Sequence, residues 1–206
     1  MTSPNSVAPF YEGWRFAQER LVERIGELSL QQLELRAAPH LWPIWAIAAH
    51  TAAVRPYWLC HVFKEPGAER TPFNDPGGDG WEDDLTHPRE AGELVSALQS
   101  TWAIVEDCLN RWTPAMLQEE FRREFDGQIQ IHTRQGVLLR LLTHDAYHIG
   151  EITQTLGMHG LREIYIWTSR TLTPADAAAK PALKTYEVIR EGRDSNPGSG
   201  NTRSSA

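Results

Sequence analysis

The chain from Leu138 to Ile152 reads Leu-Leu-Arg-Leu-Leu-Thr-His-Asp-Ala-Tyr-His-Ile-Gly-Glu-Ile, and this stretch decides the fold. Its apolar residues recur at intervals of three and four, which is the period of an amphipathic helix. His144 and His148 are four residues apart, so they stack on one helical face, which also carries Leu141. A buried imidazole without a partner costs roughly 1–3 kcal/mol. A metal ion would satisfy both rings at once.

His50 is the third histidine that can join this pair. It lies in an apolar stretch that begins at Pro43 and is rich in alanine, so another helix can approach it closely. If this second helix neighbours the one with His144 and His148, three imidazoles converge inside a helix bundle. Three imidazole nitrogens leave one coordination position open, which is the pattern of catalytic rather than structural zinc. Nickel and iron accept the same ligands.

The remaining periodicity predicts two more long helices and a β-hairpin. One helix follows Pro9 and the other begins near Pro88, each with apolar residues at the helical period. Around Asp126-Gly127 the period changes to two, and Asp-Gly is a turn signal, so a short hairpin is expected there. Thr133 can then cap the last helix. The predicted fold class is all-α: a four-helix bundle with a short β-hairpin before the last bundle helix and a C-terminal extension.

Composition divides the chain into a domain, two tails and one long loop. Residues 1–8 and 191–206 are expected to be disordered tails, and residues 9–190 to form the bundle domain with its extension. Residues 64–88 are rich in proline, glycine and aspartate, which predicts a long surface loop. Loops of this length are usually functional lids or disordered. Trp81 in this loop indicates that it folds back onto an apolar surface.

Charge and length argue against several classes of partner. The chain has 206 residues and a formal net charge of −7, which disfavours nucleic acid or an anionic membrane as the main partner. No run approaches the roughly 20 apolar residues of a membrane helix, and the start of the chain lacks a signal pattern, so the expected location is cytoplasmic. Cys60 and Cys108 are far apart and lack a Cys-x-x-Cys pattern, which indicates core thiols of a reducing compartment.

Six further residues are candidates for a role around the metal or in a substrate pocket. Carboxylates often orient ligand imidazoles, and aromatic rings line pockets for small molecules. The candidates are Asp145, Glu151, Tyr57, His61, Trp45 and Trp58. Arg55 and Arg140 could contact an acidic substrate, but both are interpreted first as surface charges. No catalytic residue is assigned.

Two other metal motifs do not fit the sequence. A zinc-protease helix needs glutamate directly after its first histidine, and Asp145 stands at that position. A di-iron bundle needs Glu-x-x-His pairs and further glutamates on facing helices, and the apolar stretch around His50 offers none.

The chain resembles the DinB-like family, also called DinB/YfiT or damage-inducible proteins. The resemblance rests on a helix with His50, a hairpin after it, and a final helix with the run His-Asp-Ala-Tyr-His-Ile-Gly-Glu-Ile, in which Glu stands where relatives typically have Gln. It covers roughly residues 10–160. It implies a four-helix bundle that binds one divalent metal ion through His50, His144 and His148, often as a homodimer.

Some members of this family are metal-dependent transferases or isomerases that use low-molecular-weight thiols. The resemblance therefore implies a thiol-dependent S-transferase or isomerase that acts on a small electrophilic molecule. In such an enzyme the metal lowers the pKa of a bound thiol, which then attacks the electrophile. One alternative is a non-catalytic metal-binding stress-response protein whose ion is structural or senses a ligand. Another is a helical interaction module whose histidines are core residues.

Overall fold

The computed structural model describes residues 5–74, 81 and 84–167. The chain divides into a unit of residues 1–168 and a unit of residues 169–206, and every described residue lies in the first. The expected tail 191–206 and most of the expected C-terminal extension fall outside the described residues. None of the helices in the described part is long and apolar enough to cross a membrane.

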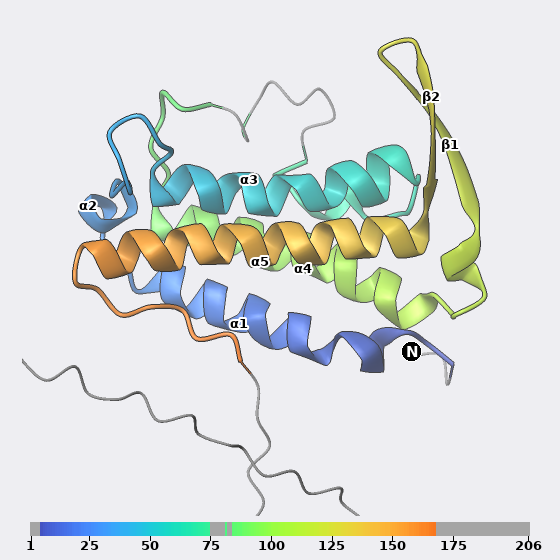
Figure 1. Cartoon of the computed structure of the whole chain (residues 1–206), viewed down its shortest axis with the longest axis horizontal. Coiled ribbons are helices and arrows are strands. Elements are labelled where there is room, and N and C mark those ends of the chain that lie inside the picture. Colours follow the sequence, from blue (N-terminus) through green and yellow to red (C-terminus); the bar gives the residue numbers. More distant parts are fainter. Residues whose placement is uncertain (1–4, 75–80, 82–83, 168–206) are drawn as a thin grey trace, which may run out of the picture. The chain divides into compact units, whose positions relative to one another are not determined.

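Four long helices form a bundle, as the sequence predicted (Figure 1). They are α1 (Glu12–Gly26), α3 (Ile44–Pro56), α4 (Ala91–Arg111) and α5 (Arg134–Met158). The helices α1 and α3 each pack against both α4 and α5. Because α3 and α4 run in the same direction (Figure 1), the chain between them has to return along the bundle, and the connection is correspondingly long.

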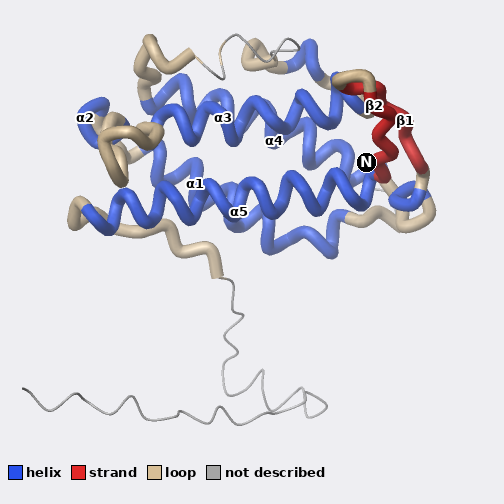
Figure 2. Tube along the Cα trace, turned by 45° about the horizontal axis from the view of Figure 1, so that its top comes forward, coloured by secondary structure: helices blue, strands red, loops and turns tan. Residues whose placement is uncertain are grey.

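Shorter elements lie at the two ends of the bundle (Figure 2). One end carries α2, which Ser29 caps through its side chain. After Pro56, α3 continues as a π-helical turn, because proline cannot supply an N–H to the α-helical ladder. The short elements are η1 (Ala8–Tyr11), α2 (Leu30–Leu33), η2 (Tyr57–Val62), η3 (Ala68–Arg70), η4 (Met116–Gln118), β1 (Glu120–Phe125) and β2 (Gln128–Thr133).

The hairpin of β1 and β2 is antiparallel and leads directly into α5 (Figures 1 and 2). Its turn residues Asp126 and Gly127 have φ values of 51° and 68°, the left-handed region that a two-residue hairpin turn requires. Thr133 is both the last residue of β2 and the N-cap of α5, and its hydroxyl accepts the N–H of Gly136 at 3.1 Å. The predicted hairpin and cap are therefore confirmed.

The core consists of two apolar clusters with a polar layer between them. One cluster lies toward α2 and includes Ile44 and Leu98, and the other lies toward the hairpin and includes Leu138. The layer between them carries Arg55 and Asp145, which are both buried. This layer is at the middle of the bundle, where the histidines also lie.

Two segments outside the helices pack more closely than a loop or tail would. Val7 lies within the expected N-terminal tail 1–8, yet it is buried and its N–H donates to the carbonyl of Trp112 at 3.0 Å. In the long loop, Trp81 packs against Phe73 and donates to Glu93 at 2.6 Å, and both rings cover the apolar cluster toward α2. The loop therefore folds back, as Trp81 indicated.

Candidate metal centre

The packing of α3 against α5 brings His50, His144 and His148 together. The Nε2 atom of His144 lies 3.0 Å from Nε2 of His50 and 3.1 Å from Nε2 of His148. His144 and His148 come from successive turns of α5, while His50 comes from the facing side of α3. His148 is buried, and the other two rings are partly exposed. The three residues that the sequence singled out therefore form one cluster of nitrogen atoms.

Glu151 fixes the orientation of His148. The Nδ1 atom of His148 donates to Oε2 of Glu151 at 2.7 Å, because a carboxylate can only accept. Burial lowers the pKa of His148 despite this carboxylate, and the neighbouring His144 and His50 lower it further. The ring is therefore neutral near pH 7, with its proton on Nδ1 and its lone pair on Nε2. This is the tautomer in which Nε2 can bind a metal ion.

The residues present fit a divalent ion such as zinc. Nitrogens bound to tetrahedral zinc at about 2.0–2.1 Å are roughly 3.3 Å apart. The two Nε2 separations, 3.0 and 3.1 Å, are close to this value. One ligand atom from each of the three histidines lies within 4.8 Å of the others. The cluster could therefore hold a metal ion.

Asp145 does not orient a ligand imidazole by a hydrogen bond. Its Oδ1 is 3.9 Å from Nδ1 of His144, which is longer than a hydrogen bond. Its Oδ2 instead accepts from Arg55 and from the indole of Trp14, each at 2.8 Å. Burial alone would raise the pKa of Asp145, but the Arg55 guanidinium and these hydrogen bonds keep it below its usual value. The interpretation of Arg55 as a surface charge was wrong, because its side chain is fully buried.

A cavity of about 460 Å³ opens beside the histidines. Its wall combines apolar and aromatic groups with a few polar ones, which is the usual make-up of a small-molecule site. The wall includes His50, His148, Glu151, Trp42, Tyr147 and His40. Sequence reasoning missed Trp42, Tyr147 and His40. Only the aromatic character of Trp42, close before the second helix, could have pointed to the cavity. No described residue of 64–88 lines it.

The other predicted pocket residues lie elsewhere. Trp45 is buried in the apolar cluster toward α2, and Trp58 in the cluster toward the hairpin. Tyr57 accepts a hydrogen bond from Arg123 of β1. His61 pairs through its ring with the side chain of Asn74. Among the six candidates, only Glu151 both lines the cavity and contacts a histidine of the cluster.

Comparison with known proteins gives the family. The sequence model of the DinB superfamily matches residues 14–152, which is more than half of the chain. The chain belongs to the DinB superfamily. This match includes His50, His144 and His148, so the histidine cluster lies inside the family domain. No curated protein matches the chain.

A solved DinB-like structure supports the fold. The crystal structure of a DinB-like protein from Bacillus cereus ATCC 10987 has a TM-score of 0.58 and 19% sequence identity to this DinB superfamily member. The match covers 80% of this chain and 100% of the Bacillus cereus chain. At this identity the similarity concerns the fold, and the chemistry has to be argued from the histidine cluster and its cavity.

Proposed function

We propose that this DinB superfamily member is a divalent-metal-dependent enzyme that holds its ion through His50, His144 and His148. The observation that carries the proposal is the double role of one atom, Nε2 of His144, which lies within 3.1 Å of both other Nε2 atoms. In a neutral ring this atom has either one proton or one lone pair. It can therefore make one good hydrogen bond, as donor or as acceptor, but not two to the neighbouring nitrogens.

The proton on Nδ1 of His148 sharpens this argument. Because that proton goes to Glu151, Nε2 of His148 presents a lone pair to His144. If His144 donates to it, Nε2 of His144 has no lone pair left to accept from His50 and no second proton to donate to it. If His144 accepts from His50 instead, two lone pairs face each other across 3.1 Å. A cation at the centre of the three nitrogens removes the conflict, which favours a metal site over a cluster of core histidines.

The chain's own groups prepare this site for a small molecule. Glu151 keeps the His148 ring in one tautomer and one orientation. Trp42 packs edge-on against His50, and Tyr147 packs edge-on against His148, so both rings stand beside the cluster where they line the cavity. An ion bound there would lower the pKa of a thiol or water ligand toward neutrality.

We infer from these features a thiol-dependent S-transferase or isomerase acting on a small electrophilic molecule. The apolar wall of the cavity suits an organic electrophile, and the open coordination position suits a low-molecular-weight thiol. Zinc is the first choice of ion, with nickel and iron as alternatives. The proposal includes a cytoplasmic location, which such thiols require, and a homodimer as the assembly to test.

The first test measures metal content by plasma mass spectrometry after dialysis against a mild chelator. We expect near one ion per chain in the wild type and almost none in His148→Ala. His87→Ala is the matched control, because His87 is exposed and pairs with Asp84 outside the cluster. If the wild type stays empty after loading with zinc, nickel and iron in turn, the proposal is wrong.

The second test separates an enzyme from a binding protein. The loaded protein is mixed with a chlorinated nitroaromatic compound and a panel of low-molecular-weight thiols, and thiol consumption is followed. We expect faster consumption with loaded wild type than with chelated protein or His148→Ala. A large drop in melting temperature on chelation, without turnover for any thiol, would instead establish the non-catalytic metal-binding protein.

A further inference from the structure

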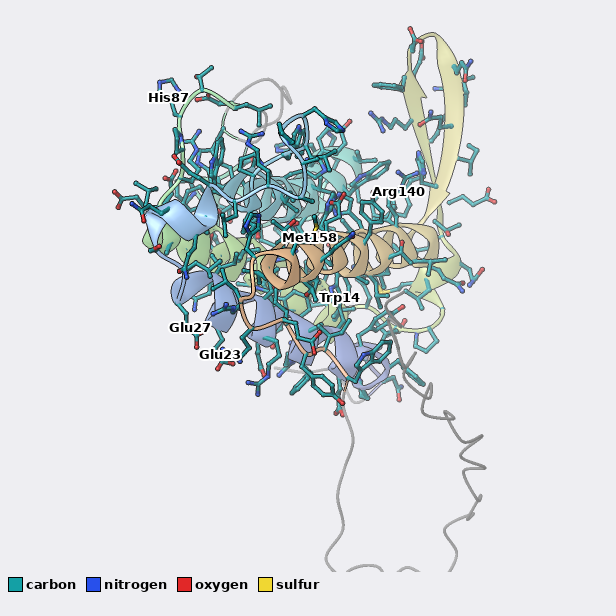
Figure 3. The ribbon with its side chains drawn as sticks, turned by 60° about the vertical axis from the view of Figure 1, so that its left-hand side comes forward. Trp14, Glu23, Glu27, His87, Arg140 and Met158 are labelled. Carbon is teal, nitrogen blue, oxygen red and sulfur yellow. The ribbon has the colours of Figure 1, made fainter. Side chains whose placement is uncertain are left out.

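Two arginines meet on one indole at the base of the hairpin. The guanidinium carbon of Arg140 on α5 lies 4.6 Å from the ring centroid of Trp58, and that of Arg123 on β1 lies 5.3 Å from it. Arg123 also stacks on Tyr57 and donates to its hydroxyl. Figure 3 shows Arg140 on the side of α5 that is next to the hairpin. Arg140 is exposed and Arg123 is half-buried, so both guanidiniums can be reached by a solute.

Neither of these two charges has an acidic partner in the part of the chain that the structure describes. No described carboxylate lies within 4.0 Å of Arg123 or Arg140, although Arg122 on the same strand reaches Glu124 at 3.9 Å. Arg134, at the start of α5, pairs with both Glu65 and Glu119. Two like charges beside one indole repel each other. An anion bound between them would attract both guanidiniums and offset this repulsion.

His132 reports the local excess of positive charge. Its ring packs edge-on against Trp58 with the centroids 5.1 Å apart. Burial lowers the pKa of His132, and the charges of Arg140 and Arg123 lower it further. The imidazole therefore stays neutral near pH 7 and does not add to the repulsion. Its Nε2 proton goes to the side-chain oxygen of Gln130 at 3.2 Å, so the neutral ring adds no further donor for an anion.

The arginine pair lies on the same side of the bundle as the histidine cluster. Arg140 precedes His144 by four residues on α5, which places it on the same face and about 6 Å further along the helix axis. The cavity with Trp42 lies in the other direction, toward Glu151 and the C-terminal end of α5. The histidines therefore stand between an apolar cavity and a positively charged patch.

We propose that Arg123 and Arg140, stacked on Trp58, form a binding site for a small oxyanion, a carboxylate or a phosphate group. Guanidinium groups match the planar fork of such anions and remain charged at every relevant pH. If the proposed function is correct, this site would hold the anionic end of the same thiol or substrate whose reacting atom lies at the histidines. The distance of about one helical turn suits a small molecule with one acidic group.

The test uses the whole chain without metal, so that its result on the oxyanion site does not depend on the proposed metal site. Chelator-treated protein is titrated with inorganic phosphate and, in a second arm, with succinate, by calorimetry at pH 7.5 and low ionic strength. We expect saturable binding in at least one arm, and the stronger arm identifies the preferred oxyanion. Arg140→Gln and Arg123→Gln should each weaken this binding about tenfold. Arg140→Lys, which keeps the charge and loses the fork, should fall in between.

Arg122→Gln is the matched control, because Arg122 is an exposed arginine one residue before Arg123 on the same strand. It should leave the affinity unchanged. The oxyanion site is refuted if neither anion binds to the wild type, or if Arg122→Gln weakens binding as much as Arg140→Gln. Melting temperatures check that each variant is folded. A protein that takes up one metal ion but binds neither anion would refute the oxyanion site without contradicting the proposed metal site.

Discussion

The Arg55 guanidinium and the Asp145 carboxylate lie 2.8 Å apart in the middle of the bundle, and both side chains are almost entirely buried. Asp145 directly follows His144 in the sequence, yet its carboxylate turns to the polar layer that separates the two apolar clusters. Gln18 accepts another bond from Arg55 at 2.7 Å. The helix that carries His144 and His148 is therefore attached to α1 and α3 by a charged network.

Removing one member of this ion pair should destabilise the fold strongly. Asp145→Ala leaves Arg55 buried without its partner, and breaking a buried pair typically costs about 3–5 kcal/mol. The free energy of unfolding by urea measures the loss. Arg55→Met and Asp145→Leu should each be destabilising when made alone. The double variant with both changes should lose clearly less free energy of unfolding than the sum of these two losses, because it buries no unpaired charge. Additive losses would show that the pair contributes through packing alone.

Glu151 should set the metal affinity without binding the metal itself. In Glu151→Gln the acceptor for Nδ1 of His148 is neutral, so the ring is held less firmly. We expect zinc to bind about tenfold more weakly, measured in competition with a fluorescent chelator. Glu12→Gln, an exposed change at the start of α1, is the control and should not alter the affinity. An unchanged affinity in Glu151→Gln would remove this carboxylate from the site.

Both cysteines should be unreactive in the folded protein. Burial raises the pKa of Cys60, and it raises the pKa of Cys108 to about 12. The thiolate is the reactive form, so at pH 8 little of it is present at either position. We expect Ellman's reagent to label neither thiol over minutes in native protein, and both after unfolding in guanidinium. Rapid labelling of one thiol in the native state would show an opening that the structure does not contain.

The Thr133 cap should contribute measurably to stability. Thr133→Ala removes the hydroxyl that accepts the N–H of Gly136, and losing such a cap costs about 1 kcal/mol. Thr143→Ala is the matched control, because Thr143 is an exposed threonine inside the same helix. It should change the unfolding free energy by less than about 0.5 kcal/mol. Equal effects of the two substitutions would argue against the cap.

Local signals in the sequence accounted for most of the fold. The change of period around Asp126-Gly127 predicted the hairpin because few residue pairs favour two successive left-handed conformations. The helical period of the stretch after Thr133 placed His144 and His148 on one face. These features depend on residues a few positions apart, so a single sequence is enough to find them.

Features that depend on distant residues were harder to predict. Arg55 was interpreted as a surface charge because its partner Asp145 is 90 positions away and gives no local sign. The residues that line the cavity beside the histidines also gave no local sign. Trp45 and Trp58 looked suitable by composition, but helix packing buries them and brings Trp42 and Tyr147 to the histidines instead. Which aromatic ring faces a cavity is decided by tertiary packing.

If the histidine cluster binds a metal ion as proposed, the separation of His50 and His144 by 94 residues makes metal uptake depend on the order of folding steps. We expect contacts between residues so far apart to form late. Closing a long loop costs conformational entropy, and only the contacts of the packed helices offset this cost. His144 and His148, by contrast, come together as soon as the helix α5 forms. A refolding chain would thus first present a weak two-nitrogen site, and the third nitrogen would arrive only when α3 docks. Tight zinc capture in a stopped-flow refolding experiment would time that docking step.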